Sequence, residues 1–585
     1  MFNHIGYIFL SVNRLYKAAK SACLGLLLCA GSVFLPLVCA AQTSGIPLHS
    51  PAYEILDRLD IISGVKSPVH PELKYFPRKD AADYALALDS QYTRVTWRDE
   101  ADLQYLFDDN NDCLTDPGRY CTHNSRGLFK VFYKTPANMF EVNAKDFSLR
   151  ANPLFNFYLG KQKDDPELVF VNQRGLEVRG SVDDKVFFYT NLIENQARFP
   201  NYVTQWIDTF QAVPGAGLYK TYSPRILDIE NGYDYNIANA YISVKASRHI
   251  GIQFGHGRHF IGNGYRSLFL SDFANNGFYL KINTRVWKLH YQNLFLELSP
   301  LSKTQVPGNV LLPKKYAAIH YLNYRITPNL AVGLFEATIF NRSRQFELQY
   351  LNPVILYRTV EGMIGSPDNV IVGFDGRWNF LRRFQVYSQL LIDEFLFSAI
   401  VKPEEKGWWG NKFGFQAGLK YINAFGVDHL DLQLEYNTVR PYTYSHYDSL
   451  NSYTHYNQPL AHPLLSNFRE MIVIAKYQPL PRLSLTARFM HADTGENTAE
   501  QNWGANPLLG YGSRVQDFGN FTGQGVAATV DLFGLNASWM LYHNLYVDLT
   551  ILLRNKNSTD DTRDLTTNVF GVGLRMNIWN QNLDF

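Results

Sequence analysis

The sequence predicts an all-β fold, a transmembrane antiparallel β-barrel of about 18 strands with a small N-terminal helical segment. The first observation is composition: 40 Phe and 37 Tyr among 585 residues, with only 18% charged residues. The second is that no run of about 20 apolar residues, as a spanning helix requires, follows the N-terminus. The third is period-two alternation from about residue 147 onward. Together these features are typical of a barrel whose wall faces lipid outside and a polar lumen inside.

The alternation is clearest in three stretches. In residues 428–437, Leu430, Leu432, Leu434 and Tyr436 alternate with polar residues. The same pattern recurs in residues 483–489 and 570–578. Each stretch predicts a strand with one apolar and one polar face. A soluble sandwich would alternate as well, so the pattern alone does not indicate a membrane.

Connection lengths favour the membrane barrel. The predicted strands are joined in pairs by tight turns, and much longer loops separate the pairs. Short turns on one side and long loops on the other are typical of outer-membrane barrels. The tight turns are expected at residues 181–185, 247–250, 326–329, 380–383, 424–428, 478–482 and 541–544.

The first 41 residues predict a cleaved export signal. Arg14, Lys17 and Lys20 precede an apolar stretch at residues 23–38, and Ala40 and Ala41 supply small residues before a cut. The alternative is an uncleaved anchor. The expected domains are therefore a signal at 1–41, a periplasmic helical segment at 42–125 and an outer-membrane barrel at 126–585.

Helical periodicity and caps predict the helical segment. Ser50 and Pro51 begin a helix that Gly64 ends, a second helix is expected over 79–88, and Thr96 with Asp99 begins a third. This segment is too small for an independent enzyme domain.

Two cysteines remain after the predicted signal. Cys113 and Cys121 flank a Pro-Gly turn, and in an oxidising compartment this spacing predicts a disulfide, with two free thiols as the alternative. Asp108 and Asp112 resemble the start of a calcium loop. Cys113 and Arg119 occupy the positions where such a loop needs Gly and Glu, so we expect a solvated acidic loop without metal.

Five segments of the chain carry recognisable motifs: residues 55–59 and 76–80 in the helical segment, and residues 255–275, 351–375 and 440–463 in three loops. Together they resemble the Wzi-like capsule-assembly family and the RemB-type gliding-motility proteins. The order of the segments matches as well as their content, and the resemblance spans nearly the whole chain after the signal. One departure is Phe260 and Ile261, which stand where capsule proteins carry tryptophans; this favours the gliding-type branch.

The resemblance implies an 18-stranded barrel that works at the cell surface with polysaccharide or with adhesion and gliding proteins. Outer-membrane lipid and lipopolysaccharide would surround it, and the barrel-assembly machinery would insert it. The net charge of +2 is too small to indicate nucleic-acid binding. No cofactor, metal or enzyme signature is found, and the alternative function is a channel for small solutes.

Candidate ligand-binding residues fall into two groups. In the glycine-rich segment 255–276, an inward-folded loop would place polar side chains at the barrel mouth, either for packing or for contact with a glycan or solute. A second group lies on later loops, where aromatic side chains offer flat faces to sugar rings or form an interfacial belt. The first group is Arg258, His259, Asn263, Tyr265, Arg266 and Asp272; the second is Trp408, Trp409, Tyr444 and His446.

Overall fold

The computed structural model describes residues 43–93, 95–122, 132–183, 185–223, 230–306, 308–342, 345–366, 368–579 and 582–585. The predicted signal at 1–41 and the predicted boundary at 125/126 lie outside the described residues. None of the described helices is long and apolar enough to cross a membrane.

The body of the molecule is a closed barrel of 18 antiparallel strands, which confirms the predicted fold class. The first and last wall strands close it, because Phe155–Gln162 of β2 pairs with β22 in antiparallel register. Four short strands lie outside the wall: β1 (Phe140–Ala144), β5 (Lys220–Tyr222), β16 (Thr454–His455) and β17 (Gln458–Pro459). The wall strands are β2 (Phe147–Gln162), β3 (Leu168–Val182), β4 (Val186–Arg198), β6 (Gly232–Lys245), β7 (Ile250–Gly257), β8 (Gly277–Val286), β9 (Leu289–Leu298), β10 (Lys315–Thr327), β11 (Leu330–Phe340), β12 (Asn369–Phe380), β13 (Phe384–Glu394), β14 (Lys412–Tyr421), β15 (Leu430–Val439), β18 (Phe468–Leu480), β19 (Leu483–Glu496), β20 (Val526–Tyr542), β21 (Leu545–Ser558) and β22 (Leu565–Met576).

Short turns gather at one end of the barrel and most of the longer connections at the other, as the sequence predicted. Tight turns join β3 to β4, β6 to β7, β10 to β11, β12 to β13, β18 to β19 and β20 to β21. The turn between β8 and β9, at Trp287 and Lys288, was not predicted. We call the two ends the turn end and the loop end.

Side chains alternate across the wall as predicted. Leu434 and Tyr436 of β15 point outward and are exposed, whereas Glu435 and Asn437 point into the lumen and are fully buried. Aromatic rings form a girdle on the outside of the turn end, where Phe384 packs on Tyr421 with ring centroids 4.5 Å apart and Trp287 on Tyr324 at 5.9 Å. An apolar band bordered by aromatic rings is the surface of a barrel in lipid.

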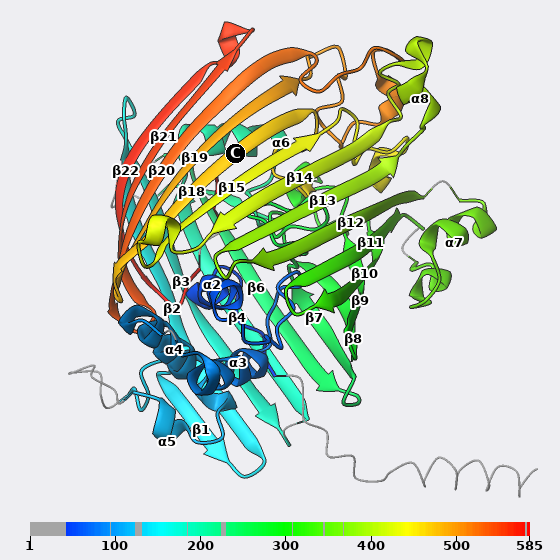
Figure 1. Cartoon of the computed structure of the whole chain (residues 1–585). Helices are drawn as coiled ribbons and strands as arrows, with labels where there is room; N and C mark the ends of the chain where they lie inside the picture. Colours follow the sequence, from blue (N-terminus) through cyan, green and yellow to red (C-terminus); the bar gives the residue numbers. More distant parts are fainter. Residues whose placement is uncertain are drawn as a thin grey trace, which may run out of the picture.

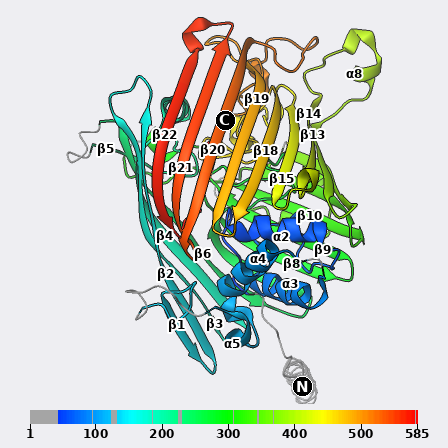
Figure 2. The same cartoon turned by 60° about the vertical axis from the view of Figure 1, so that its left-hand side comes forward.

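The N-terminal residues form a helical unit at the turn end that reaches into the lumen (Figure 2). Its main helices are α2 (Pro51–Ile62), α3 (Arg78–Gln91) and α4 (Trp97–Asp109), followed by η1 (Asn111–Cys113) and α5 (Pro117–Tyr120). The predicted caps are present: the Ser50 hydroxyl accepts from Ala52, and Thr96 and Asp99 form a reciprocal capping box.

The two cysteines correct the disulfide prediction, because both are free thiols in the structure. Cys113 ends η1 and Cys121 follows α5, and both pack against the apolar core of the helical unit. Burial raises the pKa of the Cys121 thiol to about 12 and also raises that of Cys113, so both thiols are held protonated.

Candidate binding site in the lumen and at the loop end

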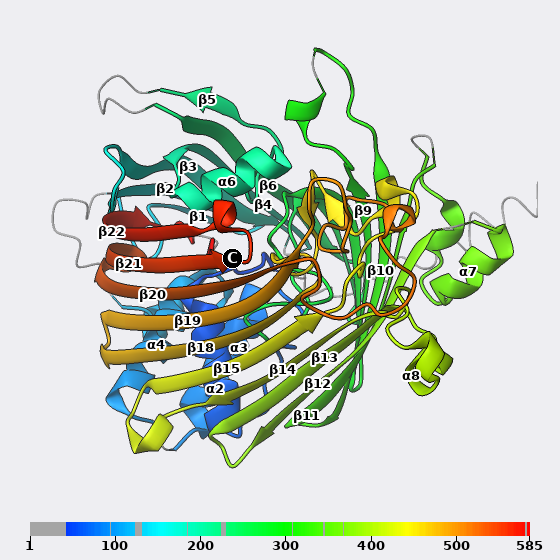
Figure 3. The ribbon, with the colours of Figure 1, turned by 90° about the horizontal axis from the view of Figure 1, so that it is seen from above.

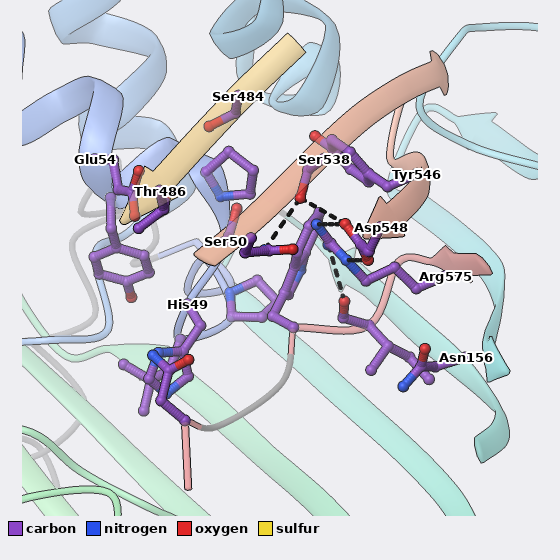
Figure 4. Close-up of a pocket in the computed structure, with 18 of the residues that line it drawn as sticks. His49, Ser50, Glu54, Asn156, Ser484, Thr486, Ser538, Tyr546, Asp548 and Arg575 are labelled. Carbon is purple, nitrogen blue, oxygen red and sulfur yellow. Dashed lines mark hydrogen bonds and ion pairs between the residues drawn. The ribbon is translucent and has the colours of Figure 1, made fainter. Parts of the chain in front are cut away.

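A cavity of about 1180 Å³ lies inside the barrel. The helical unit and the inward loop that connects β7 to β8 line it, together with the β4–β6 connection, the residues after β22 and the inner faces of strands that include β2, β4, β19, β20 and β22. Figure 4 shows His49, Ser50 and Glu54 from the helical unit on one side, with Ser538, Asp548 and Arg575 on another.

An ion pair between Arg575 and Asp548 lies on the strand side of the cavity. Arg575 Nε lies 2.5 Å from Asp548 Oδ2, and the Ser538 hydroxyl donates to Asp548 Oδ1 at 2.5 Å. The Arg575 guanidinium also stacks over the Tyr546 ring, 4.2 Å from its centroid. Because both charges already have partners, this wall offers polar contacts without a free charge.

Ion pairs hold the helical unit against the lumen. Arg377 of β12 is bonded to Asp60 of α2 and to Glu72, at 2.5 and 2.9 Å. Lys420 of β14 lies 2.7 Å from Asp57. These pairs are buried, so removal of one partner would leave an uncompensated charge.

The inward loop is locked by one carboxylate. Glu435 accepts hydrogen bonds from the backbone N–H of Tyr265 at 2.6 Å and from that of Arg266 at 3.0 Å. A glycine is required at position 264, because a Cβ there would lie 2.6 Å from Glu435 Oε2 and 2.8 Å from the Arg266 carbonyl. The predicted inward folding of this loop is therefore confirmed.

An apolar part of the loop, residues 268–270, packs against one side of the lumen. Phe269 is fully buried, stacks on Phe335 of β11 at 4.6 Å, and lies against Gly373, where a Cβ would be 2.4 Å from its ring. The connection between β15 and β18 covers the loop, since the Tyr444 hydroxyl donates to the Leu268 carbonyl at 2.8 Å and Tyr453 to that of Phe269 at 2.8 Å.

Residues after β22 return into the lumen. Asp584 forms ion pairs with Arg488 of β19 at 2.7 Å and with Arg266 at 3.5 Å. Phe585 is buried among Tyr202 and Trp206 of α6 (Asn201–Phe210), inside the ring of strands seen from above in Figure 3.

The structure separates the first group of predicted residues. Arg258, Asn263, Tyr265 and Asp272 line the cavity, and Asp272 is bonded to His49 of the helical unit. The other two do not. Arg266 is buried between Glu470 and Asp584, and His259 lies edge-on to Tyr279 with ring centroids 4.4 Å apart. Burial, with Lys281 nearby, lowers the pKa of His259, so its imidazole is neutral.

The second group lies away from the cavity, on the connections at the loop end. Trp409 packs on Tyr511 at 4.6 Å, and the Arg514 guanidinium lies 4.4 Å from the Trp409 ring centroid. The backbone N–H of Trp409 donates to the Asp517 carbonyl at 2.8 Å, which joins the β13–β14 and β19–β20 connections. We call Trp408, Trp409, Tyr447, Tyr511 and Arg514 the aromatic platform. Tyr447 is 73% exposed there.

The remaining two predicted residues are buried beneath the loop end, and His446 contacts the platform. Tyr444 is buried against the inward loop, as described above. His446 is buried, and its ring lies 5.9 Å from that of Tyr511. Burial lowers the pKa of His446, which favours the neutral ring.

One group of potential metal ligands occurs among the described residues: Asp99, Asp102 and His429. The Arg58 guanidinium already lies beside it, 2.5 Å from Asp99 and 3.3 Å from the His429 Nδ1 atom. Arg58 therefore supplies the positive charge that these carboxylates need, and the cluster joins α2 and α4 to the turn end.

Several site residues were not predicted from the sequence. His49, Glu54, Lys74, Ser538 and Asp548 line the cavity but belong to elements far apart in the chain. For the strand residues, a signal was available: polar side chains on the inward face of a predicted strand. For the helical unit no such signal existed, because contacts with distant strands place it in the lumen, and its local sequence does not indicate them.

The comparisons with known proteins agree with this architecture. No protein-family model matches the chain, and no curated protein matches it. Among solved structures, the chain resembles Wzi of Escherichia coli, an outer-membrane protein involved in group 1 capsule assembly and described as a carbohydrate-binding β-barrel, at TM-score 0.56 and 14% identity over 92% of this chain and 100% of that one. OprD of Pseudomonas aeruginosa, an outer-membrane protein, aligns over 74% of this chain and 94% of that one at TM-score 0.40 and 12% identity. The likeness to Wzi, together with the closed ring of 18 strands, shows that the chain has the fold of an outer-membrane β-barrel.

Proposed function

We propose that the chain is a non-enzymatic outer-membrane protein that presents its loop end at the cell surface and holds polysaccharide there, as support for a capsule or for adhesion and gliding machinery. The apolar wall, the aromatic girdle and the separation of turns from loops support the membrane location. In this location the helical unit lies on the periplasmic side, and lipid and lipopolysaccharide surround the wall.

The aromatic platform carries the proposal. Tyr447 offers an exposed ring at the loop end beside the partly exposed Trp409 and Tyr511 rings, and Arg514 adds a cation held by Asp517 at 2.6 Å. Flat aromatic faces pack against the C–H faces of sugar rings, and a nearby guanidinium can bind the carboxylates of acidic sugars. The Wzi structure, whose fold this chain shares, is described as carbohydrate-binding.

The filled lumen supports a scaffold rather than a pore. The helical unit, the inward loop, the β15–β18 connection and the residues after β22 all occupy it. The second candidate function is a solute channel, and one observation favours it: the cavity is lined by charges of both signs.

Binding of purified surface polysaccharide to the protein in detergent tests the proposal. We expect Trp409→Ala and Tyr511→Ala each to weaken binding by roughly 2- to 10-fold, because one aromatic contact contributes about 0.5–1.5 kcal/mol. Trp287→Ala is the matched control, since Trp287 is an exposed aromatic residue at the turn end. Unchanged binding by both platform variants, or no binding by the parent, would contradict the proposal.

A further inference from the structure

A row of polar side chains on the outside of the barrel breaks the apolar pattern of the wall. Asn293 of β9, His320 of β10 and Glu336 of β11 lie directly opposite one another in the strand register. They point outward, because the alternate residues Ile319 and Tyr321 belong to the apolar core inside the lumen. We call these three side chains the outer polar row.

The outer polar row lies within the lipid-facing band. His320 lies four positions before Tyr324 on the same strand, and Tyr324 packs on Trp287 in the aromatic girdle. With a rise of about 3.3 Å per residue and a tilt of about 40°, His320 lies roughly 10 Å above the girdle, near the middle of a band about 25 Å tall. Uncovered polar groups at that depth are strongly disfavoured.

The connection between β11 and β12 covers this row. Residues 345–366, with η4 (Leu348–Leu351) and α7 (Tyr357–Ile364), fold back onto the outer wall of β9, β10 and β11. The Tyr357 ring lies 3.9 Å from that of His320, the Arg358 N–H donates to Glu336 Oε1 at 3.2 Å, and Asn293 donates to the Pro353 carbonyl at 3.3 Å. Glu336 thus lies at the N-terminus of α7, where a negative charge is favoured.

The cover exposes four large apolar side chains on its outer side, beside the polar Gln349, Asn352 and Thr359. Leu348, Val354, Leu356 and Met363 are between 67% and 82% exposed. Arg358 is exposed too, but it is paired with Glu361 at 2.6 Å and has a long stem that can carry its charge toward the interface. Figures 1 and 3 show α7 projecting from the outer wall, away from the lumen.

We propose that residues 345–366 form an external strap that lies in the outer leaflet, contacts lipid acyl chains with its exposed apolar side chains, and seals the outer polar row from lipid. Acyl chains are the occupant because the strap is continuous with the lipid-facing wall, where Leu334 of β11 and Phe374 of β12 are also exposed. The inference rests on the membrane location proposed above.

Fluorescence quenching by lipids brominated in their acyl chains tests the strap. An environment-sensitive fluorophore is attached to Val354→Cys in the chain without the predicted signal at 1–41, carrying C113S and C121S and reconstituted in liposomes. Leu334→Cys on the wall and Asp561→Cys at the loop end are the controls. We expect quenching at position 354 to match that at 334 and to exceed that at 561 several-fold.

The outcomes separate the strap from the membrane location itself. If position 334 is quenched but 354 is not, the strap inference is wrong. Quenching of position 354 by iodide dissolved in the water would then show that it faces water, and no quenching by iodide would show that a protein partner or a second copy shields it. If position 334 is not quenched either, the membrane location fails. As a second test, deletion of residues 345–364 should lower the folded fraction at least fivefold in heat-modifiability gels, and Asn293→Leu, His320→Leu and Glu336→Leu together should restore it. A deletion that folds like the parent, or no restoration, would contradict the sealing role.

Discussion

Glu435→Ala should release the inward loop. The Glu435 carboxylate is fully buried and accepts from five donors: the Tyr265 and Arg266 amides, the Tyr387 hydroxyl at 2.6 Å, Asn437 at 3.0 Å and Gln416 at 3.3 Å. Alanine leaves all five without this partner inside the lumen.

The magnitude follows from the burial of these groups. Each buried donor left without a partner costs about 1–3 kcal/mol, so the two loop amides together account for about 2–6 kcal/mol. If most of this cost falls on the loop, the free energy of loop opening drops by the same amount. At about 1.4 kcal/mol per factor of ten, amide exchange in the loop should accelerate by roughly 30- to 10⁴-fold.

Hydrogen exchange measured by mass spectrometry on peptides covering residues 258–272 is the assay. Gln433→Ala is the control, because Gln433 is on the same strand and donates only to the Tyr387 hydroxyl among its described contacts. Protection of the loop in Glu435→Ala equal to that in the control would refute the view that this carboxylate locks the loop.

Three further predictions concern the wall, the loop and the helical unit. Leu434→Arg places a charge on the lipid face and should reduce the amount of assembled barrel, because that charge costs about 2–4 kcal/mol. Leu311→Arg lies on an exposed loop and should assemble normally. Equal assembly of the two variants in heat-modifiability gels would contradict the assignment of faces. Gly264→Ala should increase exchange of the inward loop, because its methyl group would meet Glu435, and unchanged exchange would mean that the approach is not tight. Burial disfavours the charged form of His49, but the Asp272 carboxylate beside it raises the pKa of His49 overall. This stabilisation is complete below the unfolded pKa of about 6.5 and is lost as pH rises through the raised folded pKa. The difference in melting temperature between the parent and His49→Gln should therefore shrink from pH 6 to pH 9, and a constant difference would contradict the pairing.

Local signals made the wall predictable. Alternation in residues 428–437 and turn residues near Asn329 and Asn544 act within one strand or turn, so they are visible in the sequence. The inward loop was predictable as well, because charged residues such as Arg266 and Asp272 are too polar to face lipid, and the neighbouring glycines permit the close backbone approach of a folded loop.

Long-range pairing made the rest unpredictable. Arg377 pairs with Asp60 across 317 positions of sequence separation, and nothing local in either strand or helix indicates the partner. The outer polar row even contradicts the alternation rule locally, since His320 stands where an apolar residue is expected and only the strap, folded back from another connection, explains it. The predicted binding residues fall into two separate places because long-range contacts decide where each loop lies. The cavity residues near Arg258 and the platform residues near Trp409 share a polar or aromatic character but lie in different parts of the fold.

Single-channel conductance of the purified full-length protein in planar bilayers tests the central claim, that the barrel is a filled scaffold. The contacts of the helical unit, of the inward loop at Glu435 and of Asp584 predict no steady open channel in the parent. Deletion of residues 262–271 should raise conductance sharply if the barrel still assembles. A large, steady open pore in the parent would contradict the account and favour the channel.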